Sequence, residues 1–124
     1  MKESELSKSI KEYLEYNRCL VYRMNSGSFK NEATGTWIRG QAAGTPDLCV
    51  GILHEGLHIL GWVEVKIPKK GNLSEKQIFF LKNMDKLHCP WLVAESIDDA
   101  KLWLSNWDYH GNSKYVDLIL NMKL

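Results

Sequence analysis

Stretches of hydrophobic and polar residues divide the chain into a series of short predicted helices and strands. Apolar residues at helical spacing predict an amphipathic helix over residues 3–17, and three mainly apolar segments after it predict strands. These strands cover residues 19–24, 48–53 and 57–66. A second helical pattern spans residues 74–88, a short apolar strand follows at residues 91–94, and a further helix opens at residues 98–100. This order predicts an α/β fold.

The connections between these elements predict a mixed sheet flanked by helices. The tight Glu55-Gly56 turn makes the strands on either side of it an antiparallel pair. The second helix is a crossover connection, so the two strands that it joins are expected to run parallel. Residues 28–44 are expected to form a long polar loop, and the apolar tail over residues 115–120 is expected to pack on the core. We expect one domain over residues 1–124.

Three charged residues border or interrupt the apolar strands. Glu64 and Lys66 lie two positions apart on a strand, so their side chains point to the same face, while Val65 points to the other. If Asp47 opens the neighbouring strand, it brings a second carboxylate to the same end of the sheet. Carboxylates hold hard cations such as Mg²⁺, which activate water and stabilise charge at phosphorus. The pattern suits phosphodiester hydrolysis, and its alternative is a buried ion pair.

An ordered set of motifs along the chain is more specific than these charges alone. Pro46-Asp47 followed by Glu64-Val65-Lys66 resembles the PD-(D/E)XK nuclease signature. The full set comprises a helical N-terminal Glu, Arg23-x-Asn25-Ser26-Gly27, Gly44-x-Pro46-Asp47, Glu64-Val65-Lys66 and Leu73-Ser74-x-x-Gln77. With these motifs, roughly residues 3–95 resemble the VRR-NUC branch of that superfamily, in its stand-alone, phage-type form.

The resemblance implies a restriction-endonuclease-like αβββαβ core and a metal-dependent DNA endonuclease. Asp47 and Glu64 would hold one Mg²⁺ or Mn²⁺ together with the backbone carbonyl of Val65. Glu3 would complete the metal shell or organise a ligated water. Lys66 would position the attacking water and stabilise the pentavalent phosphorus, and the products would carry a 5′-phosphate and a 3′-hydroxyl.

Two of the predicted site residues have an alternative explanation. Glu3 shares the core-facing side of its helix and matches the family position best, with Glu5 as the nearest competitor. An acid so early in a helix can also simply complement the macrodipole. Gln77 is placed near Lys66 by the resemblance, but it is also the N3 residue of a capping box that Ser74 opens. The two roles of Gln77 conflict only if one side chain must fill both at once.

Several polar residues are candidates for contact with the DNA backbone. They are Arg23, Asn25, Lys30, Arg39, Lys69 and Lys70. Their alternative is a solvated surface, a turn or a loop. Residues 64–86 carry six lysines against three acids, a local charge of +3, whereas residues 95–108 carry one lysine against four acids, a local −3. This asymmetry favours a basic functional face on a chain whose net charge is only +1.

The remaining expectations concern substrate and surroundings. A compact nuclease without an added DNA-reading domain is expected to select branched DNA, such as a Holliday junction, and to cut it as a homodimer. The alternatives are a nonspecific nuclease or nickase, and a catalytically silent DNA-binding module.

The polar N-terminus and the lack of a long apolar run predict a soluble protein, with no membrane contact. Three cysteines with no ligand spacing predict buried free thiols and a cytoplasmic location.

Overall fold

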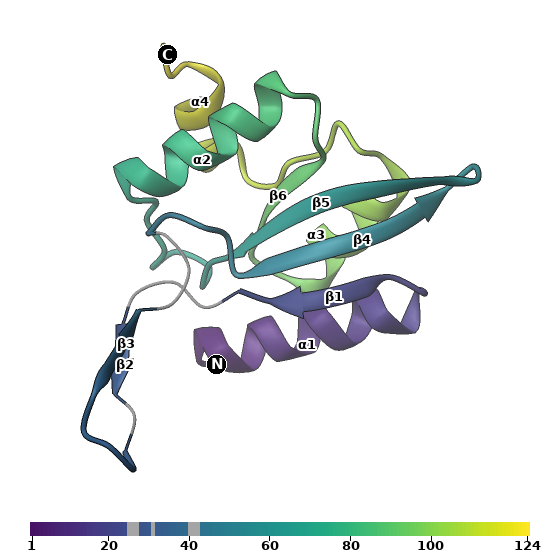
Figure 1. Ribbon diagram of the computed structural model, residues 1–124. Helices are drawn as coiled ribbons and strands as arrows, with labels where there is room; N and C mark the ends of the chain where they lie inside the picture. Colours follow the sequence, from purple (N-terminus) through teal and green to yellow (C-terminus); the bar gives the residue numbers. More distant parts are fainter. Residues whose placement is uncertain (25–27, 31, 40–42) are drawn as a thin grey trace.

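A four-stranded mixed sheet forms the centre of the fold. The computed structural model describes residues 1–24, 28–30, 32–39 and 43–124 (Figure 1). The sheet contains β1 (Leu20–Arg23), β4 (Leu48–His54), β5 (Leu57–Val65) and β6 (Trp91–Ala94), in the order β1-β4-β5-β6. Antiparallel pairing joins β1 to β4 and β4 to β5, whereas β6 runs parallel to β5. The predicted mixed sheet and the parallel crossover are therefore confirmed.

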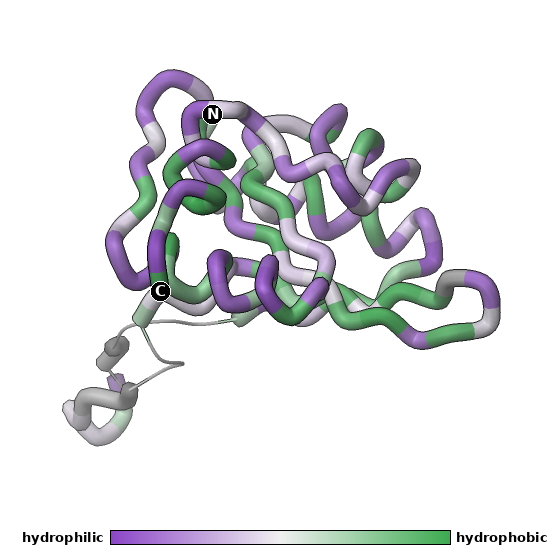
Figure 2. The backbone as a smooth tube through the Cα atoms, turned by 90° about the horizontal axis from the view of Figure 1, so that it is seen from above, coloured by the Kyte–Doolittle hydropathy of each residue, from purple (hydrophilic) through white to green (hydrophobic). Residues whose placement is uncertain are grey.

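Helices cover both faces of this sheet. They are α1 (Glu3–Tyr16), α2 (Glu75–Lys86), α3 (Ile97–Ser105) and α4 (Ser113–Leu120). Alternate residues of β4 and β5 pack into one hydrophobic cluster with α1 and α3. A second cluster joins Trp91 and Val93 of β6 to Leu81 of α2 and to Tyr115 and Ile119 of α4. Figure 1 shows α2 and α4 together above the sheet, and Figure 2 shows the strands as mainly hydrophobic stretches.

The short strand β6 shows why both helical layers are needed. Its four residues are all fully buried. Leu92 and Ala94 belong to the cluster with α1 and α3, while Trp91 and Val93 belong to the cluster with α2 and α4. A strand buried on both faces is apolar at every position, which is how residues 91–94 read in the sequence. The apolar tail predicted to pack on the core is helix α4.

The loop predicted over residues 28–44 is corrected by the structure, which contains a β-hairpin there. Strands β2 (Ser28–Lys30) and β3 (Trp37–Arg39) pair antiparallel and form a two-stranded sheet of their own. The hairpin projects away from the body of the fold in Figure 1. Strands of three residues are too short for an alternating pattern to be recognised in a sequence, which explains the wrong prediction.

The expectations about thiols and membranes can also be compared with the structure. Cys19, Cys49 and Cys89 are free, but each is only partly buried, so the prediction of buried thiols is wrong in that respect. Partial burial still raises the pKa of the Cys19 and Cys49 thiols. No helix among the described residues combines the length and the apolar character that crossing a membrane requires.

Candidate active site

Three carboxylates from separate parts of the chain meet at one end of the sheet. One oxygen atom each of Glu3, Asp47 and Glu64 lies within 4.8 Å of the other two. Glu3 is the first residue of α1, Asp47 immediately precedes β4, and Glu64 is near the end of β5. Among the described residues this is the acidic group with ligand-like spacing, and its α1 member is Glu3 rather than Glu5.

Asp47 is fixed by hydrogen bonds to both neighbouring strands. The backbone N–H of Val65 donates to Asp47 Oδ2 at 2.7 Å, and the backbone N–H of Met24 donates to the Asp47 carbonyl at 2.8 Å. The register pairs Leu48 with Val63, which brings the start of β4 beside Glu64. The Asp47 carboxylate therefore has little freedom to leave the site. Val65, whose carbonyl is predicted to be a further metal ligand, is the last residue of β5 and directly precedes Lys66.

Glu64 and Lys66 lie on the same face, as the strand alternation predicts. Both are almost fully buried, with exposed fractions of 2% and 8%. Lys66 Nζ lies 3.5 Å from Glu64 Oε2. Burial, followed by the proximity of Asp47, raises the pKa of Glu64 to about 9, although Lys66 acts in the opposite direction.

The carboxyl of Glu64 is therefore neutral at pH 7 when no cation is bound. The 3.5 Å contact is then one between an ammonium and a protonated carboxyl. A buried carboxyl flanked by two further acids has more negative partners than one lysine can neutralise. A divalent cation would supply the missing positive charge and favour the ionised form. The all-oxygen donor set is of the kind that Mg²⁺ and Mn²⁺ prefer.

Gln77 makes contacts that are compatible with both of the roles that the sequence offered as alternatives. Its Oε1 accepts a hydrogen bond from the Ser74 backbone N–H at 2.9 Å, and its own N–H donates to Ser74 Oγ at 3.2 Å, which completes the capping box of α2. Its Nε2 donates to Glu64 Oε2 at 3.4 Å. The two roles are compatible because they use opposite ends of the amide. Helix α2 thus orients a carboxylate of the acidic group.

Gly44 allows the segment before Asp47 to lie directly against α2. Its φ is +92°, and a Cβ atom at this position would lie 2.6 Å from the backbone oxygen of Lys76. A side chain would push the segment away from the helix and move Asp47. The sequence contained Gly44 as part of a motif, but its partner, 32 positions further along the chain, could not be read from the pattern.

The predicted DNA contacts among the described residues lie on several separate parts of the fold. Arg23 is exposed, ends β1 and pairs with Leu48, next to Asp47. Lys69 and Lys70 are exposed in the turn after β5. The backbone positions of Lys30 and Arg39 lie in the β2–β3 hairpin, whereas Asn25 lies outside the described residues.

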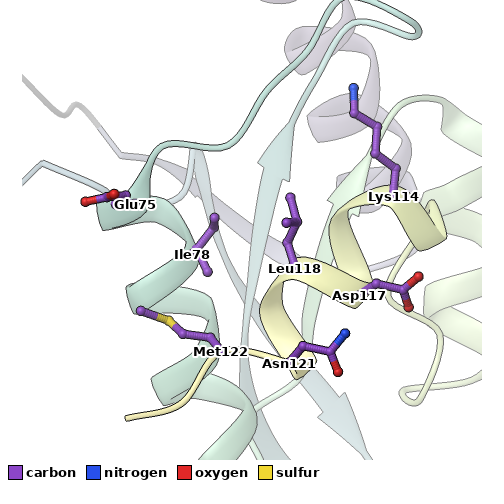
Figure 3. Close-up of a pocket in the computed structure, with 7 residues that line it drawn as sticks. All are labelled: Glu75, Ile78, Lys114, Asp117, Leu118, Asn121 and Met122. Atoms are coloured by element: carbon purple, nitrogen blue, oxygen red, sulfur yellow. The ribbon is translucent and has the colours of Figure 1, made fainter.

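A separate hollow of about 480 Å³ lies between α2 and α4 (Figure 3). Ile78, Leu118 and Met122 supply its apolar lining, with polar residues at its rim. Glu3, Asp47 and Glu64 are not among its lining residues. Figure 3 shows the Lys114 side chain extending out of this hollow, away from Met122.

Comparison with known proteins agrees with the architecture. The sheet order and the helices on both faces define a restriction-endonuclease-like α/β fold. A solved structure described as "VRR_NUC domain" matches with a TM-score of 0.57 and 23% sequence identity, over 84% of this chain and 95% of that chain. The chain therefore has the fold of a VRR-NUC domain, and the predicted fold is confirmed. No protein-family model matches the chain, and no curated protein matches it.

Proposed function

We propose that the chain is a VRR-NUC-family nuclease of the PD-(D/E)XK type that hydrolyses phosphodiester bonds in DNA. The observation that carries the proposal is the convergence of Glu3, Asp47 and Glu64 beside the buried ammonium of Lys66. A nearly fully buried lysine and glutamate are costly to a fold that uses them only for packing. The likeness to a VRR-NUC domain supports the same class of activity.

The side chains divide the work between holding a cation and orienting the reactants. Asp47 and Glu64 would hold Mg²⁺ or Mn²⁺, with the Val65 carbonyl as a further ligand, and Glu3 would complete the set or orient a ligated water. The bound cation would activate water and stabilise negative charge on the phosphate. Lys66 would orient the attacking water and stabilise the developing charge. Products with a 5′-phosphate and a 3′-hydroxyl are part of the same proposal.

The substrate would approach across the exposed side of this site. Arg23, Lys69 and Lys70 are proposed to contact phosphates, together with Asn25, Lys30 and Arg39. Branched DNA, including four-way junctions, is the proposed substrate, and symmetric cutting of two strands would require a homodimer. A nonspecific nuclease or nickase would share the same chemistry without the preference for branches. A silent DNA-binding module would bind without cutting.

Cleavage of labelled four-way junction, flap, linear duplex and single-stranded DNA in Mg²⁺ or Mn²⁺ tests the proposal. We expect metal-dependent cutting that is lost in Asp47→Ala and falls to a slow residual rate in Lys66→Ala. Asp108→Ala and Lys86→Ala are matched controls, because both side chains are exposed and lie outside the acidic group. Circular dichroism melting of every variant separates lost chemistry from lost folding.

The pattern of cutting distinguishes the related activities. A junction cut far faster than duplex would support structure selectivity, whereas equal rates would favour a nonspecific nuclease. Binding of the junction without cutting in either metal would favour the silent module. A protein that neither binds nor cuts DNA would refute the proposed function. Light scattering of the protein–junction complex tests the homodimer, and a bound monomer would contradict it.

A further inference from the structure

The turn after β5 folds back onto the side chain of Lys66. A Cβ atom placed on Gly71 would lie 2.7 Å from Lys66 Cβ and 3.1 Å from Lys66 Cδ. The Gly71 backbone therefore packs directly against the aliphatic stem of the lysine. A side chain at position 71 would clash with this stem, so the close packing requires glycine. The turn itself is closed by the Gly71 N–H, which donates to the Ile67 carbonyl at 3.1 Å.

Helix α4 also contacts this turn, at Gly71. The hydroxyl of Tyr115 donates to the Gly71 carbonyl at 2.9 Å, and Lys114 Nζ donates to the same oxygen at 3.0 Å. A Cβ atom on Gly71 would also lie 2.7 Å from the Tyr115 hydroxyl, so the three residues form one contact. Tyr115 is fully buried within the cluster of α2 and α4. Its position is thus set by the core rather than by the turn.

Lys66 is consequently restrained at its backbone, along its aliphatic stem and at its ammonium group. Its backbone N–H donates to the Ala94 carbonyl of β6 at 2.9 Å, and its Nζ lies 3.5 Å from Glu64 Oε2. The stem between these two points has four rotatable bonds, and Gly71 covers it. A lysine whose stem is already ordered loses less rotamer freedom when its ammonium engages a reacting phosphate.

We propose that Tyr115 of α4, acting through Gly71, is a positioning residue for Lys66. The proposal rests on the function proposed above for Lys66. It gives α4, which contributes none of the three clustered carboxylates, a defined part in the chemistry. The turn that α4 holds also includes Lys69 and Lys70. The same contact therefore positions the backbone from which these two proposed phosphate-binding side chains extend.

Tyr115→Phe tests this positioning with the least change to the core. It keeps the ring and removes the donor to Gly71. Gly71→Ala is the second variant, because its methyl group would press on the Lys66 stem. Tyr16→Phe is the matched control, since Tyr16 is 87% exposed on α1. We expect both test variants to lower kcat by roughly 10- to 100-fold while KM for the DNA changes about twofold or less.

A double-mutant cycle separates positioning from general destabilisation. In a Lys66→Ala background, Tyr115→Phe is expected to cause no further loss of residual cleavage, because its effect passes through the lysine. A second readout does not need activity. In protein labelled at lysine ¹³Cε and ¹⁵Nζ, the Lys66 signal, assigned by its loss in Lys66→Ala, should shift in Tyr115→Phe and stay in place in Tyr16→Phe.

The outcomes distinguish this inference from the proposed function. Wild-type kcat and an unshifted Lys66 signal in Tyr115→Phe would overturn the inference, as would losses that simply add to that of Lys66→Ala. If wild type cuts no DNA at all, the proposed function fails, and the Lys66 signal alone decides the positioning. If Gly71→Ala does not fold, the Tyr115→Phe results are sufficient for the decision.

Discussion

Replacing Glu64 by glutamine should stabilise the metal-free protein, and increasingly so as the pH rises. Glutamine has nearly the same shape as a protonated glutamate, and its amide can donate to Asp47 while its oxygen accepts from Gln77. The substitution therefore preserves the neutral state of the site and removes the group that can ionise. The gain is expected because burial beside Asp47 raises the pKa of Glu64 to about 9.

The sign and size of the effect follow from proton linkage. In the unfolded chain Glu64 ionises with a pKa near its ordinary value of 4.5, whereas the folded protein retains the proton up to about pH 9. Folding therefore takes up a proton in this window, and the stability of wild type falls as the pH rises through it. Each pH unit is worth about 1.4 kcal/mol at most. From pH 4.5 to 7, Glu64→Gln should gain up to about 3 kcal/mol over wild type.

Urea unfolding of wild type and Glu64→Gln in chelator-treated buffer, from pH 4.5 to 8.5, measures this difference. Titrating groups that do not interact with Glu64, such as the four histidines, are common to both proteins and cancel in the comparison. Glu5→Gln is the matched control, because it removes an exposed carboxylate of α1 outside the acidic group. Added Mg²⁺ should reverse the order, since cation binding favours the ionised carboxylate of wild type, whereas the variant offers only a neutral amide oxygen in its place.

A difference in unfolding free energy that stays constant over this pH range would refute the reasoning. It would mean that Glu64 is ionised in the folded, metal-free protein and that Lys66 outweighs burial and Asp47. A Glu64→Gln protein less stable than wild type at pH 8 would lead to the same conclusion.

Three further predictions concern the supports of the acidic group. Gly44→Ala should lower the unfolding free energy by about 1–3 kcal/mol, measured with urea, because of its φ of +92° and the contact with α2; an unchanged value would contradict the close approach. Mg²⁺ should raise the melting temperature of wild type but not of Asp47→Asn, and equal shifts would place the cation elsewhere. Gln77→Ala and Ser74→Ala should each cost about 1 kcal/mol of helix capping. Only Gln77→Ala should also weaken Mn²⁺ binding, roughly 10- to 100-fold by calorimetry, and equal affinities would refute the role at Glu64.

Much of the fold could be predicted because its elements have strong local patterns. The apolar strand β6 and the spacing of Glu64 and Lys66 follow from local patterns along a strand, and the relative directions of β4, β5 and β6 follow from a short turn and one crossover. The β2–β3 hairpin was missed because pairing between three-residue strands is decided by the backbone rather than by a periodic pattern.

The site was predictable in its residue types and less so in its supports. The motifs singled out Asp47 and Glu64, and the structure brings both together with Glu3. The contacts of Gly44 with Lys76 and of Gly71 with Tyr115 join positions 32 and 44 residues apart. Such contacts depend on how helices pack on the sheet, and no local feature of the sequence encodes them.

The connection between β1 and β4 leaves and returns to the sheet at one point. Met24, which follows β1, donates its N–H to the carbonyl of Asp47, which precedes β4, at 2.8 Å. The two ends of the connection that contains the β2–β3 hairpin are thus held together by a hydrogen bond. Doubling the length of this connection would add only about 0.6 kcal/mol to the entropic cost of closing the loop. We therefore expect that insertions or replacements in this connection change how far the hairpin extends without displacing the Asp47 carboxylate.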